Sequence, residues 1–183
     1  AALFGAVTSM LLYLSGERER SGIVFWVMGG LYSADWSAVE LLVPVALLGV
    51  GLLWLFARDL NALSLGEEQA LHLGIEPANC KRLLLAVCTL LTAVVVSQSG
   101  TIGFVGLVVP HVARLVIGPD HRWLIPSSAF AGASFLVLSD TVARVIISPA
   151  ELPVGIITAI LGGPFFLFLL RKRLSAGRRR VER

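Results

Sequence analysis

The side chains that could do chemistry are few, and the best placed pair is Asp140 and Arg144 near the end of an apolar run at 123–147. The two are four residues apart with the acid first, which on a helix brings both side chains to one face and favours a salt bridge. A charge at the edge of an apolar run is costly unless it is paired or serves a function. The two residues are therefore predicted to form an ion pair or to mark a functional site.

Other reactive residue types give weaker signals. His111 and Arg114 lie three apart, and a lone histidine of this kind is more often packed and hydrogen-bonded than a ligand. Cys80 and Cys88 are too few to predict a disulfide framework or a metal site. No G-x-x-x-x-G-K-[ST] phosphate loop occurs in the chain, so ATP, if used, must be bound by another chain. We therefore expect no catalytic residue, no metal site, no cofactor and no enzymatic activity.

The segment LSLGEEQALHLGI, residues 63–75, is too polar to cross a bilayer and has the signals of a short helix. Ser64 and Glu67 have the spacing of a capping box, and the acids Glu67 and Glu68 suit the positive end of a helix dipole. Gly74 is a natural stop, and Pro77 prevents continuation. The helix is either a surface linker or a docking helix whose leucines Leu65, Leu71 and Leu73 enter the groove of a partner.

A second segment, GTIGFVGLVVPHVAR at 100–114, combines glycines and a proline with an apolar run. Gly103, Gly106 and Pro110 predict a broken or bent helix that begins near Phe104–Leu107, after a turn at 100–103. Irregular backbone at membrane depth is tolerated only against protein or a water-filled cavity. Transporters place such breaks beside their pathways.

The elements that position these residues are long apolar helices. The chain has 183 residues, of which 56% are hydrophobic and 15% charged, with a mean hydropathy of +0.85. A soluble domain carries about 45–50% apolar and about 25% charged residues, so the composition indicates a polytopic membrane protein. We predict an all-α transmembrane bundle of about six spans. The apolar runs are 1–16, 38–57, 83–99, 103–117, 123–147 and 152–170.

A shorter uncharged piece at 21–34 suits a re-entrant or interfacial helix better than a span. Threading the runs with the C-terminal tail in the cytoplasm places 58–82, 114–122 and 171–183 inside, and 17–37, 100–102 and 148–151 outside. Twelve of the fifteen Lys and Arg residues then lie inside, as the positive-inside rule requires. The basic tail RKRLSAGRRRVER is explained as a cytoplasmic anchor, so nucleic-acid binding is not expected.

Four motifs in this order resemble the C-terminal half of FecCD-type ABC importer permeases, which take up iron–siderophore, haem and cobalamin-type cargo. The motifs are VFWVMGGLYSADW, NALSLGEEQALHLGI, GTIGFVGLVVPHVARLVIGPDHR and SDTVARVIISPAELPVGIITAILGGPFFLFLL. The chain opens inside an apolar pattern without a basic region before it, so we expect a helix cut part-way rather than a signal peptide. The resemblance implies that the six runs are the last six of ten spans.

The resemblance also implies partners and sites. Residues 1–183 would be one permease domain in the cytoplasmic (inner) membrane of a bacterium or archaeon. Its partners would be a cytoplasmic ABC ATPase, a periplasmic or lipid-anchored substrate-binding protein, a second permease subunit in a homodimer, and membrane lipid. The ATPase would bind a coupling segment at 61–76, and a short periplasmic gate helix would lie within VFWVMGGLYSADW, residues 24–36.

The site residues implied by the resemblance fall into three groups. Those of the coupling segment are Leu63, Ser64, Leu65, Gly66, Glu67, Glu68, Leu71, Leu73 and Gly74. Arg144, with Asp140, would meet an acidic residue of the binding protein. Those of the pathway and gate are Trp26, Gly29, Gly30, Gly103, Gly106 and Pro110.

Two other classes of function remain open from the residues alone. An ion-coupled secondary transporter of a small solute would need ionisable residues at the bilayer midplane, and the apolar runs hold few. A membrane scaffold without transport activity would not need glycine-rich, broken spans.

Overall fold

The computed structural model describes residues 2–32, 34–147 and 152–181, and within these ranges every regular element is a helix. This confirms the all-α prediction. The helices are α1 (Ala2–Leu14), α2 (Glu17–Met28), α3 (Trp36–Leu55), α4 (Ala57–Leu65), α5 (Glu67–His72), α6 (Pro77–Ser99), α7 (Val105–Ile117), α8 (His121–Ile146) and α9 (Val154–Val181).

Four of these helices are long and apolar enough to cross a membrane: α3, α6, α8 and the part of α9 from Val154 to Arg171. They match four of the predicted runs, although α6 begins at Pro77 rather than near residue 83. Helices α1 and α7 have 13 residues each, about 20 Å at 1.5 Å per residue, which is less than the hydrocarbon thickness. Their assignment as spans stays a prediction.

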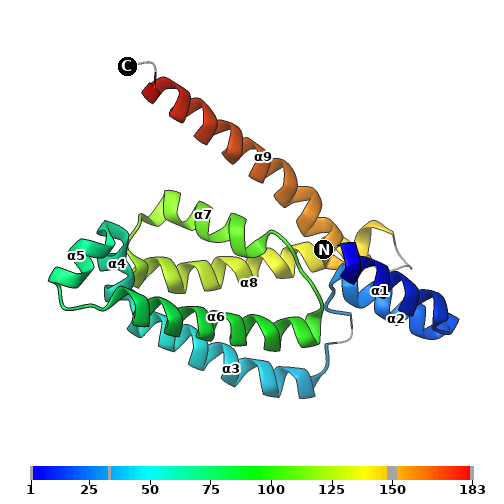
Figure 1. The fold of residues 1–183 in the computed structure, drawn as a ribbon. Helices are drawn as coiled ribbons and strands as arrows, with labels where there is room; N and C mark the ends of the chain where they lie inside the picture. The colour runs from blue at the N-terminus through cyan, green and yellow to red at the C-terminus, as the bar shows by residue number, and fades with distance from the viewer. Residues whose placement is uncertain (1, 33, 148–151, 182–183) are drawn as a thin grey trace.

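Helix α8 is the centre of the arrangement, because it packs against α3, α4, α7 and α9. Helices α3, α6 and α8 lie side by side, with α7 against α8, and α9 diverges from this group toward its C-terminus (Figure 1). The described buried side chains are mostly small: Ala57, Ala70 and Ala143 are almost completely buried. Small residues let helix backbones approach closely, as membrane bundles require, and leave large apolar side chains on the outside.

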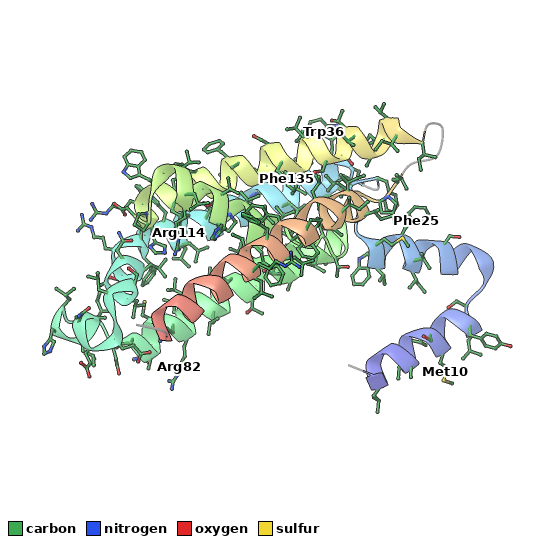
Figure 2. The ribbon with its side chains drawn as sticks, turned by 90° about the horizontal axis from the view of Figure 1, so that it is seen from above. Met10, Phe25, Trp36, Arg82, Arg114 and Phe135 are labelled. Atoms are coloured by element: carbon green, nitrogen blue, oxygen red, sulfur yellow. The ribbon has the colours of Figure 1, made fainter. Side chains whose placement is uncertain are left out.

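The bundle has two distinct ends (Figure 1). Helices α4 and α5 and the α7–α8 turn lie at one end, which we call the inner end. The end of α2 and the α6–α7 loop lie at the opposite, outer end. Arg82 and Arg114 lie toward the inner end and Phe25 toward the outer one (Figure 2). The described parts of the segments that the charge count assigned to one side of the membrane thus lie at one end; residues 33, 148–151 and 182–183 fall outside the described residues.

Backbone contacts hold the outer end together. The Gly30 N–H donates to the carbonyl of Ser99 (2.8 Å), and the Gly155 N–H, at the start of α9, donates to the carbonyl of Gly29 (3.1 Å). A Cβ at Gly155 would lie 2.0 Å from the Met28 carbonyl oxygen, so only glycine allows this approach. The hydroxyl of Thr101 donates to the carbonyl of Val27 (2.5 Å). The end of α2 is therefore fixed against both α6 and α9.

Helix α7 begins at Val105, within the predicted Phe104–Leu107, and residues 100–103 precede it as irregular backbone, as expected. The helix continues unbroken through Pro110 to Ile117, so of the two predicted forms, broken or bent, only the bent one remains. The irregular backbone ends at Phe104, whose φ of +66° is rare for a residue with a bulky side chain. A bend of α7 at Pro110, where the missing N–H leaves the Gly106 carbonyl without its helical donor, stays a prediction.

Candidate functional site

The polar side chains of the described residues concentrate at the inner end, where one amide joins two helices. The Asn61 side-chain NH₂, on α4, donates to Asp120 Oδ1 at 2.7 Å. Its carbonyl oxygen accepts from the backbone N–H of His121 at 2.9 Å and lies 2.7 Å from Nδ1 of the same residue. Both functions of the Asn61 amide are thus used to hold α4 against the first turn of α8.

Asp120 is the N-cap of α8, where its carboxylate also accepts from the Arg122 N–H at 3.0 Å. The pKa of Asp120 is lowered from its ordinary value near 3.8. The largest cause is the hydrogen bond from the Arg122 N–H, and the next is the hydrogen bond from the Asn61 amide. A lowered pKa in the folded state means that the charged form stabilises the structure above pH 4 and loses this effect as the pH falls through the lowered pKa. At neutral pH the cap is therefore a carboxylate.

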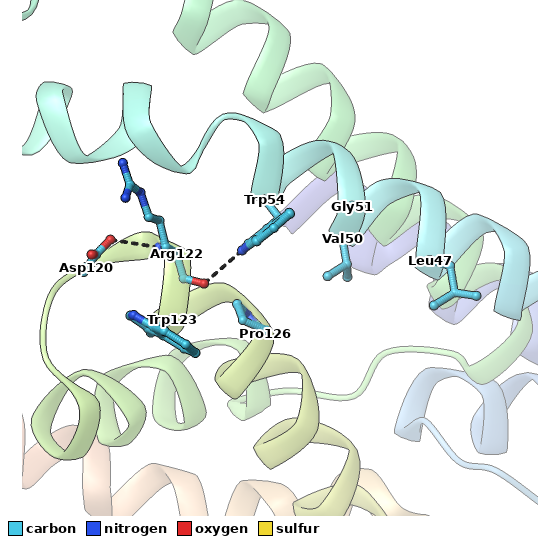
Figure 3. Close-up of a pocket in the computed structure, with 8 residues that line it drawn as sticks. All are labelled: Leu47, Val50, Gly51, Trp54, Asp120, Arg122, Trp123 and Pro126. Atoms are coloured by element: carbon cyan, nitrogen blue, oxygen red, sulfur yellow. Dashed lines mark hydrogen bonds between the residues drawn. The ribbon is translucent and has the colours of Figure 1, made fainter.

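A second link joins the end of α3 to the same turn. Trp54 Nε1 donates to the main-chain carbonyl of Arg122 at 2.9 Å (Figure 3). Because α3 and α4 are separated by Phe56 alone, the Trp54 and Asn61 bonds hold the two sides of one junction to the start of α8. A movement of α4 must therefore be passed to α8 or must break these bonds.

The segment 61–76 differs from its predicted form in one respect. Ser64 lies in the last turn of α4 and its hydroxyl donates to the Asn61 carbonyl at 2.6 Å, so it caps no helix. Gly66, with φ +127°, separates α4 from α5 and is the N-cap of α5 without a side-chain bond. The predicted capping box is therefore wrong: α4 extends over Ser64, and the carboxylate of Glu67 turns to Lys81 instead, at 2.5 Å.

The end of α5 agrees with the prediction. Gly74 has φ +80°, and its N–H donates to the Leu71 carbonyl at 2.9 Å, while the Ile75 N–H donates to that of Ala70 at 3.0 Å. This pair of bonds is a Schellman motif, which satisfies the last carbonyls of the helix. Ala70 is fully buried, so α5 is anchored on one side.

The opposite side of α5 faces outward. Leu65, Leu71 and Leu73 are 66%, 57% and 65% exposed, and Glu67 and Glu68 lie next to them. Leu63 is half-buried. The Lys81 ammonium, through its hydrogen bond and charge, lowers the pKa of Glu67, so this acid stays ionised. An apolar surface framed by carboxylates, on a segment fixed to α8, is suited to hold a partner protein.

At the other end of α8, the predicted ion pair is confirmed. Arg144 Nε lies 2.7 Å from Asp140 Oδ2, and the arginine side chain is about twice as exposed as the aspartate, 46% against 23%. The bridge lies one turn from the end of α8, toward the outer end of the bundle. It orients the guanidinium while leaving part of it accessible.

The predicted gate and pathway residues separate into two groups. Gly29 and Gly30 are buried in the backbone contacts of the outer end, and the Trp26 carbonyl accepts from the Thr101 N–H at 3.4 Å. Gly103 and Gly106 belong to the start of α7, where no atom beyond their own neighbourhood lies within 4 Å of an added Cβ. Pro110 is half-buried in α7. The structure thus joins the first group to residues 99–101 and does not bring the second group into contact with it.

Sequence reasoning missed the residues that hold the inner end: Asn61, Trp54, Asp120 and His121. The Asp-His-Arg sequence before an apolar run is an N-cap signal that could have identified Asp120. Nothing local marks Asn61, because its partners lie about 60 positions away. Among the described residues, no group of three or more His, Cys, Asp or Glu could hold a metal ion.

Comparison with known proteins supplies the family context. The sequence model of the FecCD transport family matches residues 1–172. The cobalamin import system permease protein BtuC of Halobacterium salinarum is 53% identical over 171 residues, which cover 93% of this chain and 46% of that protein. The hemin transport system permease protein HmuU of Yersinia pestis is 44% identical and covers 94% of this chain and 52% of its own length.

A solved ABC transporter chain in an inward-facing conformation has the same fold. It superposes with a TM-score of 0.84 at 38% identity, and the match covers 93% of this chain and 56% of that one. The chain therefore spans about half the length of the relatives it matches.

The first prediction concerns the Asn61 amide. Asn61→Ala in the full-length protein should remove the Asn61 bonds to Asp120 and to the His121 N–H, and their loss should cost about 1–3 kcal/mol locally. We expect faster amide hydrogen exchange in residues 57–75. Ser64→Ala, which removes a hydroxyl bonded only within its own helix, is the control and should leave exchange near the wild-type rate. Equal exchange in the two variants would contradict the assigned role of Asn61.

Proposed function

The chain belongs to the FecCD transport family, and from that premise we propose that it forms the C-terminal part of the membrane-spanning permease subunit of an ATP-driven importer. Residues 1–183 are then one permease domain with a coupling segment at 61–76. The permease performs no covalent chemistry. ATP is hydrolysed on a separate chain, because this one contains no phosphate-loop motif.

The observation that carries the proposal is the exposed face of α5 at the inner end. Leucines more than half exposed, next to Glu67 and Glu68, are suited to a groove in a cytoplasmic ABC ATPase. The Asn61 and Trp54 bonds connect this face to α8, which packs against α3, α7 and α9. ATP-driven movement of the partner would thus reach the spans through hydrogen bonds rather than through a flexible loop.

The cargo class and the other partners come to the chain through its relatives. We propose a metal chelate of the iron–siderophore, haem or cobalamin type as cargo, a periplasmic or lipid-anchored substrate-binding protein as donor, and a homodimer of permease subunits. The location is the cytoplasmic (inner) membrane of a bacterium or archaeon, since the matched relatives come from both. Transport proceeds by alternating access of a cavity between the permease subunits.

Charge reversal on α5 tests the coupling segment. Glu67→Arg with Glu68→Arg in the full-length permease should abolish co-purification of the ATPase and lower cargo uptake by at least about tenfold, because like charges at an interface repel. Glu68→Arg alone is the cleaner variant, since Glu67 also bonds Lys81 within the chain. Membrane insertion should be unchanged in both.

Glu40→Arg, the same charge change in the first half of α3, is the matched control and should keep the ATPase bound. If the Glu67/Glu68 variant retains wild-type uptake and ATPase association, the assignment of the coupling segment is wrong. An ion-coupled transporter would differ in another way, because its uptake would continue without the ATPase and would depend on a proton or sodium gradient.

Arg144 is proposed to meet a carboxylate of the substrate-binding protein, with Asp140 holding the guanidinium in place. Arg144→Glu should weaken binding-protein affinity in nanodiscs by about tenfold or more, and reversing the partner's acid should restore part of it. Asp140→Asn should have a smaller effect, because it removes the orienting group and leaves the positive charge. If Asp140→Asn is as damaging as Arg144→Glu and no partner change rescues either, the bridge is purely structural.

A further inference from the structure

An apolar groove lies on the outside of the inner end, between the last turns of α3 and the first turns of α8. Its volume is about 560 Å³. The lining residues are Leu47, Val50, Gly51, Trp54, Asp120, Arg122, Trp123 and Pro126. Figure 3 shows the labelled side chains of the two helices facing one another across it.

At its inner end the groove adjoins a second cleft of about 470 Å³, which shares the lining residues Trp54 and Arg122. The remaining walls of this cleft are Leu55, Ala57 and Arg58. The Arg122 side chain extends from α8 toward the α3–α4 junction (Figure 3). Two guanidinium groups, those of Arg58 on α4 and Arg122 on α8, thus lie at one end of the apolar groove.

Neither guanidinium is neutralised by an ion pair of the described residues. The described salt bridges are those of Lys81 and Arg144. Asp120 also lines the groove, but its carboxylate is held by the Asn61 amide and the Arg122 N–H, and it gives one negative charge against two positive ones. A net positive charge therefore remains at the mouth of the cleft.

The groove is lined by residue types that are common where a protein meets the membrane–water interface. Trp54 and Trp123 are 52% and 67% exposed, and tryptophan side chains prefer the level of the lipid headgroups. The Trp54 ring is fixed by its bond to the Arg122 carbonyl, so this wall is preformed. Gly51 leaves open space, since nothing lies within 4 Å of an added Cβ there.

We propose that this groove and cleft form a binding site for an anionic phospholipid of the cytoplasmic leaflet. The phosphate would bind between Arg58 and Arg122, and an acyl chain would lie along Leu47, Val50 and Gly51. Basic pockets between helices on the cytoplasmic side are suited to anionic headgroups. Because the site adjoins the Trp54 and Asn61 bonds that hold the α3–α4 junction to α8, a bound lipid would stabilise the junction to which the coupling segment is attached. The site goes beyond the proposed transport function and requires that the chain lie in a membrane with this groove facing lipid in the full-length permease.

Native mass spectrometry of the full-length permease tests the site, with phosphatidylglycerol and phosphatidylcholine of identical chains as probes. We expect tighter binding of phosphatidylglycerol to the wild type. Arg58→Gln and Arg122→Gln should each weaken this binding by about fivefold, the loss expected for one basic residue at a membrane surface. Arg82→Gln, the same charge change on α6, is the control and should retain the preference.

Gly51→Phe tests the apolar part without changing charge. It should fill the groove and reduce the binding of both lipids, while the melting temperature in detergent stays near that of the wild type. The proposal is overturned if the wild type has no preference for phosphatidylglycerol. It is equally overturned if a variant with both Arg58→Gln and Arg122→Gln binds phosphatidylglycerol in preference to phosphatidylcholine as the wild type does. It is also overturned if Gly51→Phe lowers the melting temperature and leaves lipid binding unchanged, because a protein segment would then occupy the groove.

Discussion

The two hydrogen-bonding functions of the Asn61 side chain are the constraint on which the inner end depends. Helix ends leave backbone groups without partners, and at a membrane boundary these groups must be satisfied by side chains or water. The first turn of α8 meets this requirement in two ways. Asp120 is its cap, and the side-chain oxygen of Asn61 accepts from the backbone N–H of His121. The same bonds fix α4, so satisfying one helix end also positions the segment that we assign to the ATPase.

The two ends of the bundle are held by different means. At the inner end the contacts are side-chain hydrogen bonds from Asn61 and Trp54. At the outer end, backbone meets backbone at Gly29, Gly30 and Gly155, with no room for a Cβ at Gly155. Helix α8 extends from the inner junction to the Asp140–Arg144 bridge. It contacts the coupling segment through α4 and carries the Asp140–Arg144 bridge.

Much of this fold could be predicted from the sequence because membrane burial imposes strong patterns. Long uncharged runs gave α3, α6, α8 and the apolar part of α9, and the positions of Lys and Arg gave segments that lie at common ends of the bundle. The i, i+4 spacing predicted the Asp140–Arg144 bridge, and Gly74 marked the end of α5. These features depend on neighbours in the sequence, for which local spacing is sufficient.

The errors occurred where distant residues decide the local structure. Ser64 and Glu67 have the spacing of a capping box, but α4 is held by Asn61 to α8 and continues past Ser64, and Lys81 takes Glu67. The glycines and proline of 103–110 left a broken helix open, but α7 is unbroken, and the positive φ falls on Phe104, a residue type that gives no such signal.

The central claim, that α4 and the start of α8 move as one unit, is tested most directly by electron spin resonance distances. Spin labels at Ser64 and Pro119 of the full-length permease, assembled with its ATPase and with Cys80 and Cys88 replaced, would be measured with and without a bound ATP analogue. The account predicts one narrow distance distribution, the same in both states; a shift or broadening on nucleotide binding would contradict it.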